Sequence, residues 1–264
     1  MLAQPAPTAP TYVMSTDGIR IATYLHEPAP GTGDLGTIVA VHGFASSAGL
    51  NWDLAGWTRT LTRAGYRLLT LDQRGHGASD KPTDPAAYRL DILVDDVLSV
   101  LDGYGVDEPH YLGYSLGSRV GWRLGVRHPD RVRSLSLGGL PEGDSLRDFD
   151  LEAARHHVRT GTTITHALTD TYVTMAEGVP GNDVEALIAL VEGLRGGPQP
   201  STAEVPPLPM LLVTGDDDAV AAGSRRLAEA AGARYVGLPG REHFNAVSSR
   251  AFKDAVLAFL AEQG

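Results

Sequence analysis

The sequence predicts an α/β fold in which helices cover a mostly parallel, doubly wound sheet. Nearly continuous apolar runs such as "TIVAVHG" (37–43) and "YRLLTLD" (66–72) are typical of strands that are buried on both faces. Amphipathic stretches separate these runs, and repeated alternation of strand and helix requires right-handed crossovers. A chain of 264 residues is long enough to form one large domain of this kind.

The first half of the chain contains several of the expected strands and helices. "IRIATYL" (19–25) alternates apolar and polar residues, as expected for a half-buried strand. Further strands are expected over 37–43, 66–72 and "PHYLGYS" (109–115), and helices over 51–64 and 90–104. In the second helix one face is apolar, which predicts that it packs on the sheet; this face carries Leu90, Leu93, Val94, Val97, Leu98 and Leu101.

The second half continues the pattern around one interruption. A helix is expected from Ser115 to about His128, where Pro129 ends it, and the strand "VRSLSLGG" (132–139) follows. From about Leu140 to Pro207 the sequence contains weak helical segments and no convincing strand. Alternation resumes with the strand "PMLLVTG" (209–215), a helix near 222–231, the strand "ARYVGLPG" (233–240) and a terminal helix over 245–262.

We interpret the interruption as a small helical lid inserted between two strands of one sheet. The chain is therefore expected to contain a first core part (1–140), a helical lid (141–207) and a second core part (208–264). Within the lid, the clearest helical segments are "LEAARHHV" and "DVEALIALVEGL".

Composition and charge exclude several classes of protein. The net charge is −10 and the 22 lysines and arginines are scattered, so no nucleic-acid partner is expected. The chain contains no cysteine, which excludes disulfides, thiolate metal sites and a cysteine nucleophile.

The chain shows no signal for a membrane or for export. No stretch approaches the roughly 18 uncharged apolar residues that a membrane span needs. The N-terminus "MLAQPAPTAPTYVM" lacks the features of a secretory signal, and its prolines predict an extended tail. We expect a cytoplasmic protein that acts on a small-molecule substrate, and the sequence indicates no particular oligomeric state.

The stretch "LGYSLGSRVG" (112–121) places Ser115 between two glycines, at the end of a buried strand and the start of a helix. This is the setting of a nucleophile elbow, a tight and strained turn in which glycine allows neighbouring chain to approach. Gly117, Gly121 and Gly125 form a small-residue stripe, which predicts close packing of the helix on the sheet. Ser115 is therefore the candidate nucleophile.

A serine hydroxyl is a weak nucleophile until a base accepts its proton, and a third group must hold that base in one tautomer. His243 in "GREHFNAV" follows the lid and falls between the last strand and the last helix. Asp216, Asp217 and Asp218 directly follow the strand 209–215. Three like charges repel one another in a dry site, so we expect one to point inward. We favour Asp218, because the loop needs a few residues to turn toward the histidine, and Asp216 is second.

An acyl-transfer site also needs N–H donors aimed at the developing oxyanion. "AVHGFASS" ends a buried strand with His42, Gly43 and Phe44, and the glycine permits a sharp turn there. The candidate oxyanion-hole donors are the N–H groups of Phe44 and of Leu116, which directly follows the candidate nucleophile. His42 is expected to orient the backbone and not to act as a base.

Together these segments resemble the α/β-hydrolase fold superfamily. "DQRGHGAS" (72–79) is similar to the superfamily's D-x-R-G-x-G-x-S turn, "HGF" to its oxyanion-hole strand end, and "HPDRVRSLSL" to the strand after its nucleophile helix. The likeness covers nearly the whole chain except residues 1–10 and the lid. It implies an eight-stranded, mostly parallel sheet, a site at the carboxyl ends of the strands, and no metal or organic cofactor.

The resemblance also assigns roles to single residues. The superfamily's G-x-x-D pattern, applied to "GDDD", makes Asp218 the acid, and Asp72, Arg74 and His76 become scaffold residues that brace loops. Ser118 stands where many members have glycine, and we expect its hydroxyl to bond back to its own helix.

The expected activity is that of a carboxylesterase-like serine hydrolase, which cleaves a carboxylic ester or a related acyl bond such as a thioester or lactone. One alternative is a C–C bond hydrolase or lyase acting on a dienone or cyclohexadiene acid, because "GYSLGSR" resembles the elbow of such enzymes. A non-catalytic ligand-binding protein of the same fold is a second alternative. Dehalogenases and most epoxide hydrolases of the superfamily have aspartate at the position of Ser115, which argues against both activities.

Overall fold

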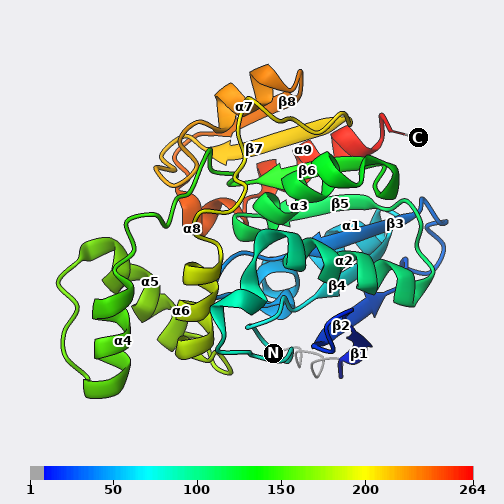
Figure 1. The fold of residues 1–264 in the computed structure, drawn as a ribbon. Coiled ribbons are helices and arrows are strands. Elements are labelled where there is room, and N and C mark those ends of the chain that lie inside the picture. Colours follow the sequence, from blue (N-terminus) through cyan, green and yellow to red (C-terminus); the bar gives the residue numbers. More distant parts are fainter. Residues whose placement is uncertain (1–8, 264) are drawn as a thin grey trace, which may run out of the picture.

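A single eight-stranded sheet forms the centre of the computed structural model, which describes residues 9–263, with strand order β1-β2-β4-β3-β5-β6-β7-β8. Strands β1 and β2 run antiparallel to their neighbours, and β3 to β8 are parallel, so the predicted fold class is confirmed (Figure 1). The strands are β1 (Thr11–Met14), β2 (Arg20–His26), β3 (Thr37–Val41), β4 (Arg67–Leu71), β5 (His110–Tyr114), β6 (Ser134–Gly138), β7 (Met210–Gly215) and β8 (Arg234–Leu238).

Strand β1 is an element that the sequence pattern did not predict. Thr11–Met14 belongs to the segment expected to form an extended tail, and instead pairs with β2, with Thr11 opposite Thr23. Its residues are largely exposed at the edge of the sheet, so they lack the apolar pattern of a buried strand. The rest of the predicted tail, residues 1–8, lies outside the described residues.

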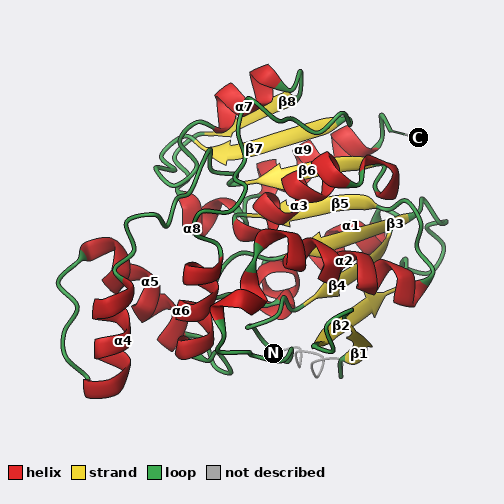
Figure 2. Ribbon diagram, in the orientation of Figure 1, coloured by secondary structure: helices red, strands yellow, loops and turns green. Residues whose placement is uncertain are grey.

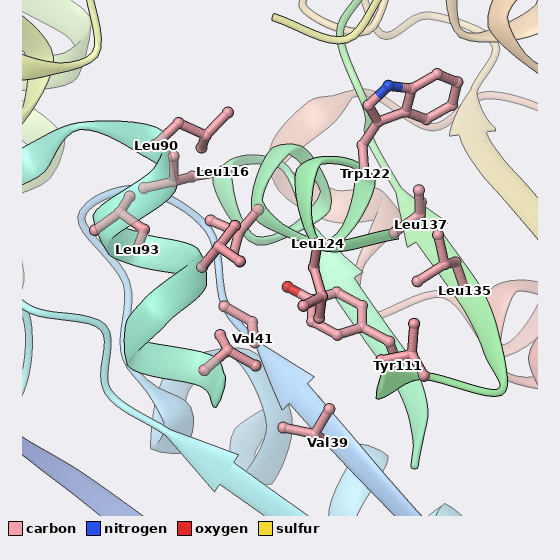
Figure 3. Packing of buried hydrophobic residues seen from close by; sticks show 14 of the residues in the cluster. Val39, Val41, Leu90, Leu93, Tyr111, Leu116, Trp122, Leu124, Leu135 and Leu137 are labelled. Carbon is pink, nitrogen blue, oxygen red and sulfur yellow. The ribbon is translucent and has the colours of Figure 1, made fainter. Parts of the chain in front are cut away.

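Helices cover both faces of the sheet (Figure 2). Alternate residues of β3 show the two layers: Val39 and Val41 pack toward one face, and Ile38 and Ala40 toward the other. The first layer contains α2 (Leu90–Tyr104), α3 (Leu116–Arg127) and α7 (Ser224–Ala230), and the second contains α1 (Trp57–Arg63) and α9 (Arg250–Leu260). Figure 3 shows residues of the first layer, in which Leu93 of α2 and Leu116 and Leu124 of α3 belong to the same buried cluster as Val39 and Val41 of β3.

Two of the predicted helices are broken in the structure. The stretch 51–64 divides into a π-helix, η1 (Gly49–Leu54), and α1, because Gly56 between them has a left-handed backbone with φ of 80°. The terminal stretch 245–262 divides into α8 (His243–Ala246) and α9, because Ser249 is extended, with φ of −61° and ψ of 134°. Helix α8 begins directly after its N-cap residue Glu242, so His243 is the first residue of a short helix and not part of the loop in which the sequence placed it.

Three helices lie between β6 and β7, in the part of the chain that we call the lid (141–207). They are α4 (Leu151–Thr160), α5 (Ala167–Gly178) and α6 (Val184–Gly193), and they lie together beyond one end of the sheet (Figure 1). Phe149, Ile164 and Ile188 belong to a small apolar cluster of the lid, against which Phe44 of the core packs. In the described part of the chain there are also two short 3₁₀ helices, η2 (Pro85–Tyr88), which contacts α6, and η3 (Pro129–Arg131).

None of the helices within residues 9–263 combines the length and the hydrophobicity that crossing a membrane would need.

Candidate active site

Ser115 lies in the sharp turn between β5 and α3. Its backbone has φ of 53° and ψ of −111°, a conformation that costs a residue with a side chain about 1–3 kcal/mol. The Ser115 N–H donates to the carbonyl oxygen of Gly138 in β6 at 2.8 Å, which ties the turn to the neighbouring strand. The turn therefore holds the serine side chain at the carboxyl end of β5, where the predicted nucleophile elbow places it.

Glycines on both sides of Ser115 let α3 approach the sheet closely. A Cβ atom at Gly117 would lie 2.0 Å from the carbonyl oxygen of Val41, and one at Gly113 would lie 2.7 Å from the carbonyl carbon of Gly117. Further along α3, a Cβ at Gly121 would lie 2.3 Å from the ring of Tyr111. Since distances this short are impossible between unbonded atoms, the glycine stripe packs tightly on the sheet, as the sequence predicts.

We expect Gly117→Ala to destabilise the protein by about 3 kcal/mol or more, because the new methyl group would force α3 away from the backbone of β3. Gly178→Ala is the matched control, since a Cβ atom there would have no neighbour within 4 Å and the residue ends helix α5. The control is expected to leave the free energy of unfolding unchanged or slightly higher. Urea unfolding of both variants measures the difference, and similar values for the two would contradict this account.

The structure brings Ser115, His243 and Asp218 together. The Nε2 atom of His243 lies 2.8 Å from Oγ of Ser115, and its Nδ1 atom lies 2.8 Å from Oδ2 of Asp218. Because a carboxylate only accepts hydrogen bonds, Nδ1 carries the proton and Nε2 is left to accept one from the serine hydroxyl. The second oxygen of Asp218 accepts the N–H of Ala221 at 3.0 Å, which fixes the carboxylate plane.

Of the three consecutive aspartates, Asp218 is the one that turns inward. Asp216 and Asp217 are exposed, whereas Asp218 is buried, with its carboxylate excluded from water. This arrangement keeps two of the three charges solvated, which is the outcome expected from their mutual repulsion.

Tyr114 and Gly139 support the imidazole of His243, and sequence reasoning missed both. The Tyr114 hydroxyl donates to the backbone carbonyl of His243, and burial raises the pKa of Tyr114, so the donor proton is retained. Gly139 has φ of 58°, and a Cβ atom there would lie 3.1 Å from Cε1 of the imidazole. The glycine pair that ends the strand 132–139 was a signal that chain approaches closely at this point.

The loop after β3 lies directly against Ser115, since a Cβ atom at Gly43 would be 3.3 Å from the serine Cβ. This loop contains Phe44, and Leu116 begins helix α3. Within the described part of the chain, the N–H groups of Phe44 and Leu116 make no hydrogen bond, as expected of donors that are kept for a ligand.

Two buried histidines hold the backbone of this loop. His42 bonds through Nδ1 to the carbonyl oxygen of Gly43 at 2.7 Å, and its Nε2 accepts the N–H of Gln73 at 3.0 Å. Because the Gly43 carbonyl and the Phe44 N–H belong to one planar peptide, this bond fixes the direction of that N–H. His76 accepts the N–H of Ala45 through Nε2 at 3.0 Å. Burial lowers the pKa of both histidines, so both rings are neutral and their Nε2 atoms can accept.

The turn 72–79 is held by charged residues that are themselves buried. Asp72 accepts the N–H groups of Ala48 at 2.7 Å and Ala78 at 2.8 Å, and so ties this turn to the segment after β3. The guanidinium of Arg74 has no exposed surface and bonds to Asp96 through two contacts of 2.6 Å.

The Ser118 hydroxyl makes a different hydrogen bond from the one that the sequence predicts. It donates to the carbonyl oxygen of Gly138 in β6 at 2.7 Å, and not to its own helix. The tight packing of α3 brings the strand carbonyl within reach, so Ser118 joins helix to sheet.

A cavity of about 220 Å³ opens beside Ser115. Its walls come from the loop after β3, from η1, from lid helix α5 and from the segment around His243; the lining residues are Gly43, Phe44, Ala45, Ser46, Leu50, Asn51, Tyr114, Ser115, Tyr172, Met175, Val179, His243, Phe244 and Val247. A second cavity of about 400 Å³ lies at the amino ends of β3, β4 and β5, at the opposite edge of the sheet from Ser115. The smaller cavity is therefore the one that can place a substrate on the serine.

Comparison with known proteins agrees with the geometry. The family model for the alpha/beta hydrolase fold matches residues 36–165. Epoxide hydrolase B of Mycobacterium tuberculosis is 37% identical over 159 residues, a match that covers 54% of this chain and 42% of that protein. The match thus spans less than half the length of this curated relative.

Solved structures cover the chain more fully. A hydrolase from Pseudomonas aeruginosa PA01 shares 27% identity with a TM-score of 0.77, covering 97% of this chain and 99% of that one. The enol-lactonase from Burkholderia xenovorans LB400 has the same fold, with 24% identity, a TM-score of 0.77 and coverage of 95% and 100%. The sheet topology, the family match and these structures together show that the chain belongs to the α/β-hydrolase fold superfamily.

Proposed function

We propose that this protein is a serine hydrolase that cleaves a carboxylic ester, or a related acyl bond, of a small molecule through an acyl-enzyme intermediate. The observation that carries the proposal is the unbroken line from Ser115 Oγ through the His243 ring to Asp218, with 2.8 Å at each contact. A hydroxyl, an imidazole and a carboxylate in this order form a general-base system that activates the serine.

The proposed reaction has two halves. As Ser115 Oγ attacks the substrate carbonyl carbon, His243 Nε2 accepts the hydroxyl proton and Asp218 stabilises the imidazolium. The N–H groups of Phe44 and Leu116 bind the negative oxygen of the tetrahedral intermediate, and His243 then gives the proton to the leaving group. In the second half a water molecule attacks the acyl-enzyme with the same proton transfers, which releases the carboxylic acid and restores Ser115.

A serine nucleophile favours acyl chemistry over epoxide opening, although the matched Mycobacterium tuberculosis protein is named an epoxide hydrolase. A carboxylate that opens an epoxide forms an ester, and water can then cleave that ester. If Ser115 opened the ring, the product would be an ether, which the same site could not hydrolyse. We therefore expect turnover of activated esters and none of styrene oxide.

The lining of the cavity favours an uncharged substrate. Among residues 9–263, none of those that line the cavity is Lys, Arg, Asp or Glu, so a substrate carboxylate would lose its hydration without gaining a cation. Arg119, one turn after Ser115 on α3, is buried, donates to Gln199 and lies 4.0 Å from Asp144, and it is not among the lining residues. This observation supports an ester substrate over the alternative of a dienone or cyclohexadiene acid.

Labelling with a fluorophosphonate probe tests the proposal against a non-catalytic binding protein. An activated serine attacks the probe's phosphorus and displaces fluoride, so the peptide that contains Ser115 should gain the mass of the phosphonyl group. A panel of activated esters, thioesters and lactones then measures which acyl bond is cleaved fastest. An unlabelled Ser115 together with no turnover across the panel would refute the proposal.

We expect kcat/KM for p-nitrophenyl esters to rise about fourfold per methylene from acetate to about hexanoate and then to level off. Burying one methylene contributes about 0.8 kcal/mol. At about 30 Å³ per water-sized group, a cavity of 220 Å³ holds roughly seven such groups. A monotonic fall in kcat/KM with chain length would contradict this account of the cavity.

Phe244 is expected to form the outer part of the cavity wall, against which the far end of the acyl chain packs, because it lines the cavity while 52% of its surface is exposed. Phe244→Ala should therefore lower the ratio of kcat/KM for the decanoate ester to that for the acetate ester, by about fivefold. Tyr12→Ala is the matched control, since Tyr12 is an aromatic residue of similar exposure (46%) on strand β1. An unchanged ratio in Phe244→Ala would show that long acyl chains leave the cavity elsewhere.

The cytoplasmic location that the sequence suggests stays a prediction, which fractionation of the source cells would test.

A further inference from the structure

The segment 43–46, which we call the oxyanion loop, is held by side chains from three separate parts of the chain. Asn51 of η1 accepts the Gly43 N–H through Oδ1 at 3.3 Å. His76 accepts the Ala45 N–H at 3.0 Å, and Asn182 of the lid donates from Nδ2 to the Ala45 carbonyl at 3.0 Å. The Phe44 N–H lies between these fixed points.

Ala45 has an unusual backbone that needs such support. Its φ of 55° is left-handed, and among residues 9–263 the one other non-glycine residue with a positive φ is Ser115. A residue with a side chain keeps this conformation only where its surroundings impose it. Ala45 is 1% exposed and is bonded on both sides, through its N–H to His76 and through its carbonyl to Asn182.

Asn182 lies between lid helices α5 and α6 and is itself held in one orientation. Its Nδ2 donates to Ala176 at 3.2 Å as well as to Ala45, so both N–H bonds of the amide are used. Ala45 also packs in a small buried cluster with Ala176 and Leu187 of the lid. The lid therefore contacts the oxyanion loop through a directed hydrogen bond in addition to apolar packing.

We propose that Asn182 is a positioning residue, which holds the Ala45 backbone and thereby keeps the Phe44 N–H aimed at the oxyanion formed on Ser115. This inference rests on the proposed function, in which the Phe44 N–H is one of the two donors. Its consequence is that the oxyanion hole is complete when the lid is seated on the loop. Substrate that holds the lid in place then also secures the geometry of the reaction.

Asn182→Asp and Asn182→Ala test the proposal. The first variant keeps the shape of the side chain and removes the donor, and the second removes the whole amide. Asp183→Ala is the matched control: Asp183 accepts the Ala186 N–H at 3.1 Å at the start of α6, so its loss weakens the lid without removing the bond to Ala45. We would measure kcat and KM for an activated ester, and the affinity for a trifluoromethyl ketone and for the alcohol of the same carbon skeleton.

The trifluoromethyl ketone adds to Ser115 and forms an oxyanion, whereas the alcohol fills the cavity without one. Both Asn182 variants should lower kcat about tenfold with KM changed less than about threefold, because loss of a whole oxyanion donor costs about 100- to 1,000-fold and a misaligned donor costs less. Their affinity for the ketone should fall about tenfold, and their affinity for the alcohol should stay the same. The Asp183 variant should behave as the wild type in all four measurements.

Wild-type behaviour of both Asn182 variants would overturn the inference. So would equal losses in the Asp183 variant, which would point to lid stability alone, or equal losses of affinity for ketone and alcohol, which would point to a binding defect. Circular dichroism checks that each variant is folded, and if Asn182→Ala is not, Asn182→Asp decides. Failure of the proposed function looks different, because the wild type itself would then neither hydrolyse the ester nor bind the ketone covalently.

Discussion

Ser115→Ala is expected to lower kcat for an activated ester by about 10⁵- to 10⁶-fold, the size of effect seen when the nucleophile of a serine hydrolase triad is removed. The variant keeps the hydrogen bond between His243 and Asp218 but lacks the hydroxyl oxygen that bonds to Nε2 of His243. Residual turnover would come from the oxyanion donors and from substrate binding alone. Steady-state kinetics with p-nitrophenyl butyrate measures the loss.

The same variant should stay folded, because alanine meets no greater backbone strain at φ of 53° than serine does. Ser118→Ala is a matched control, since Ser118 is a buried serine that follows Ser115 by about one turn of α3. Losing its hydrogen bond to Gly138 should cost about 1 kcal/mol of stability and leave kcat within about threefold of the wild type. Turnover by Ser115→Ala at more than about one thousandth of the wild-type rate would rule out Ser115 as the nucleophile.

Arg74→Met is expected to destabilise the fold by about 3–5 kcal/mol and to lower Tm by about 10 °C. The substitution keeps most of the side-chain volume but removes the cation that faces Asp96, and the Asp96 carboxylate stays buried with Ser15 as its remaining donor. An uncompensated buried charge is among the largest single losses that a fold can suffer. Differential scanning calorimetry measures the change.

The loss of stability that we expect in Arg74→Met should also depend on pH. Burial raises the pKa of Asp96, and removing Arg74, which opposes that rise, raises it further. A carboxyl with a folded-state pKa above its unfolded value stabilises the fold at low pH, and this contribution is lost as the pH rises through the folded-state pKa. The variant should therefore lose more stability at about pH 8 than at about pH 5.

Arg20→Met is the control for this prediction, because Arg20 also bonds to an aspartate, Asp80, but at the surface. Solvent screens such a pair, so Tm should change little at either pH. A Tm loss in Arg74→Met no larger than in Arg20→Met would show that the buried pair contributes no more than an exposed one.

The sequence predicted those parts of the molecule that depend on position along the chain. Ser115 and Asp218 follow the buried strands β5 and β7, and His243 follows the partly exposed strand β8. The carboxyl ends of parallel strands meet at one edge of a sheet. Sequence order and strand pattern were therefore enough to single out Ser115 and His243 as candidates and to favour Asp218 over Asp216, and the structure brings these three side chains into contact. The glycine stripe was readable for a similar reason, because small residues at helical spacing indicate close packing.

The other contacts of the site depend on which groups meet in the folded structure, and patterns along the sequence carry no information about such long-range contacts. Asn182 and Tyr114 both act on backbone carbonyl groups far away in the sequence, those of Ala45 and His243. A carbonyl is present at every residue, so nothing in the sequence marks these two as the bonded ones. Strand β1 was missed for a different reason, since its exposed edge position removes the apolar signal.

The distances along the chain between the site residues have a consequence for biosynthesis. His243 lies 128 residues after Ser115 and 25 residues after Asp218. The strands β7 and β8 that precede the aspartate and the histidine are added at one edge of the sheet. During translation Ser115 is therefore synthesised long before His243. If Ser115 is the nucleophile that we propose, it stays without its base on the nascent chain until the segment that contains α8 has been made.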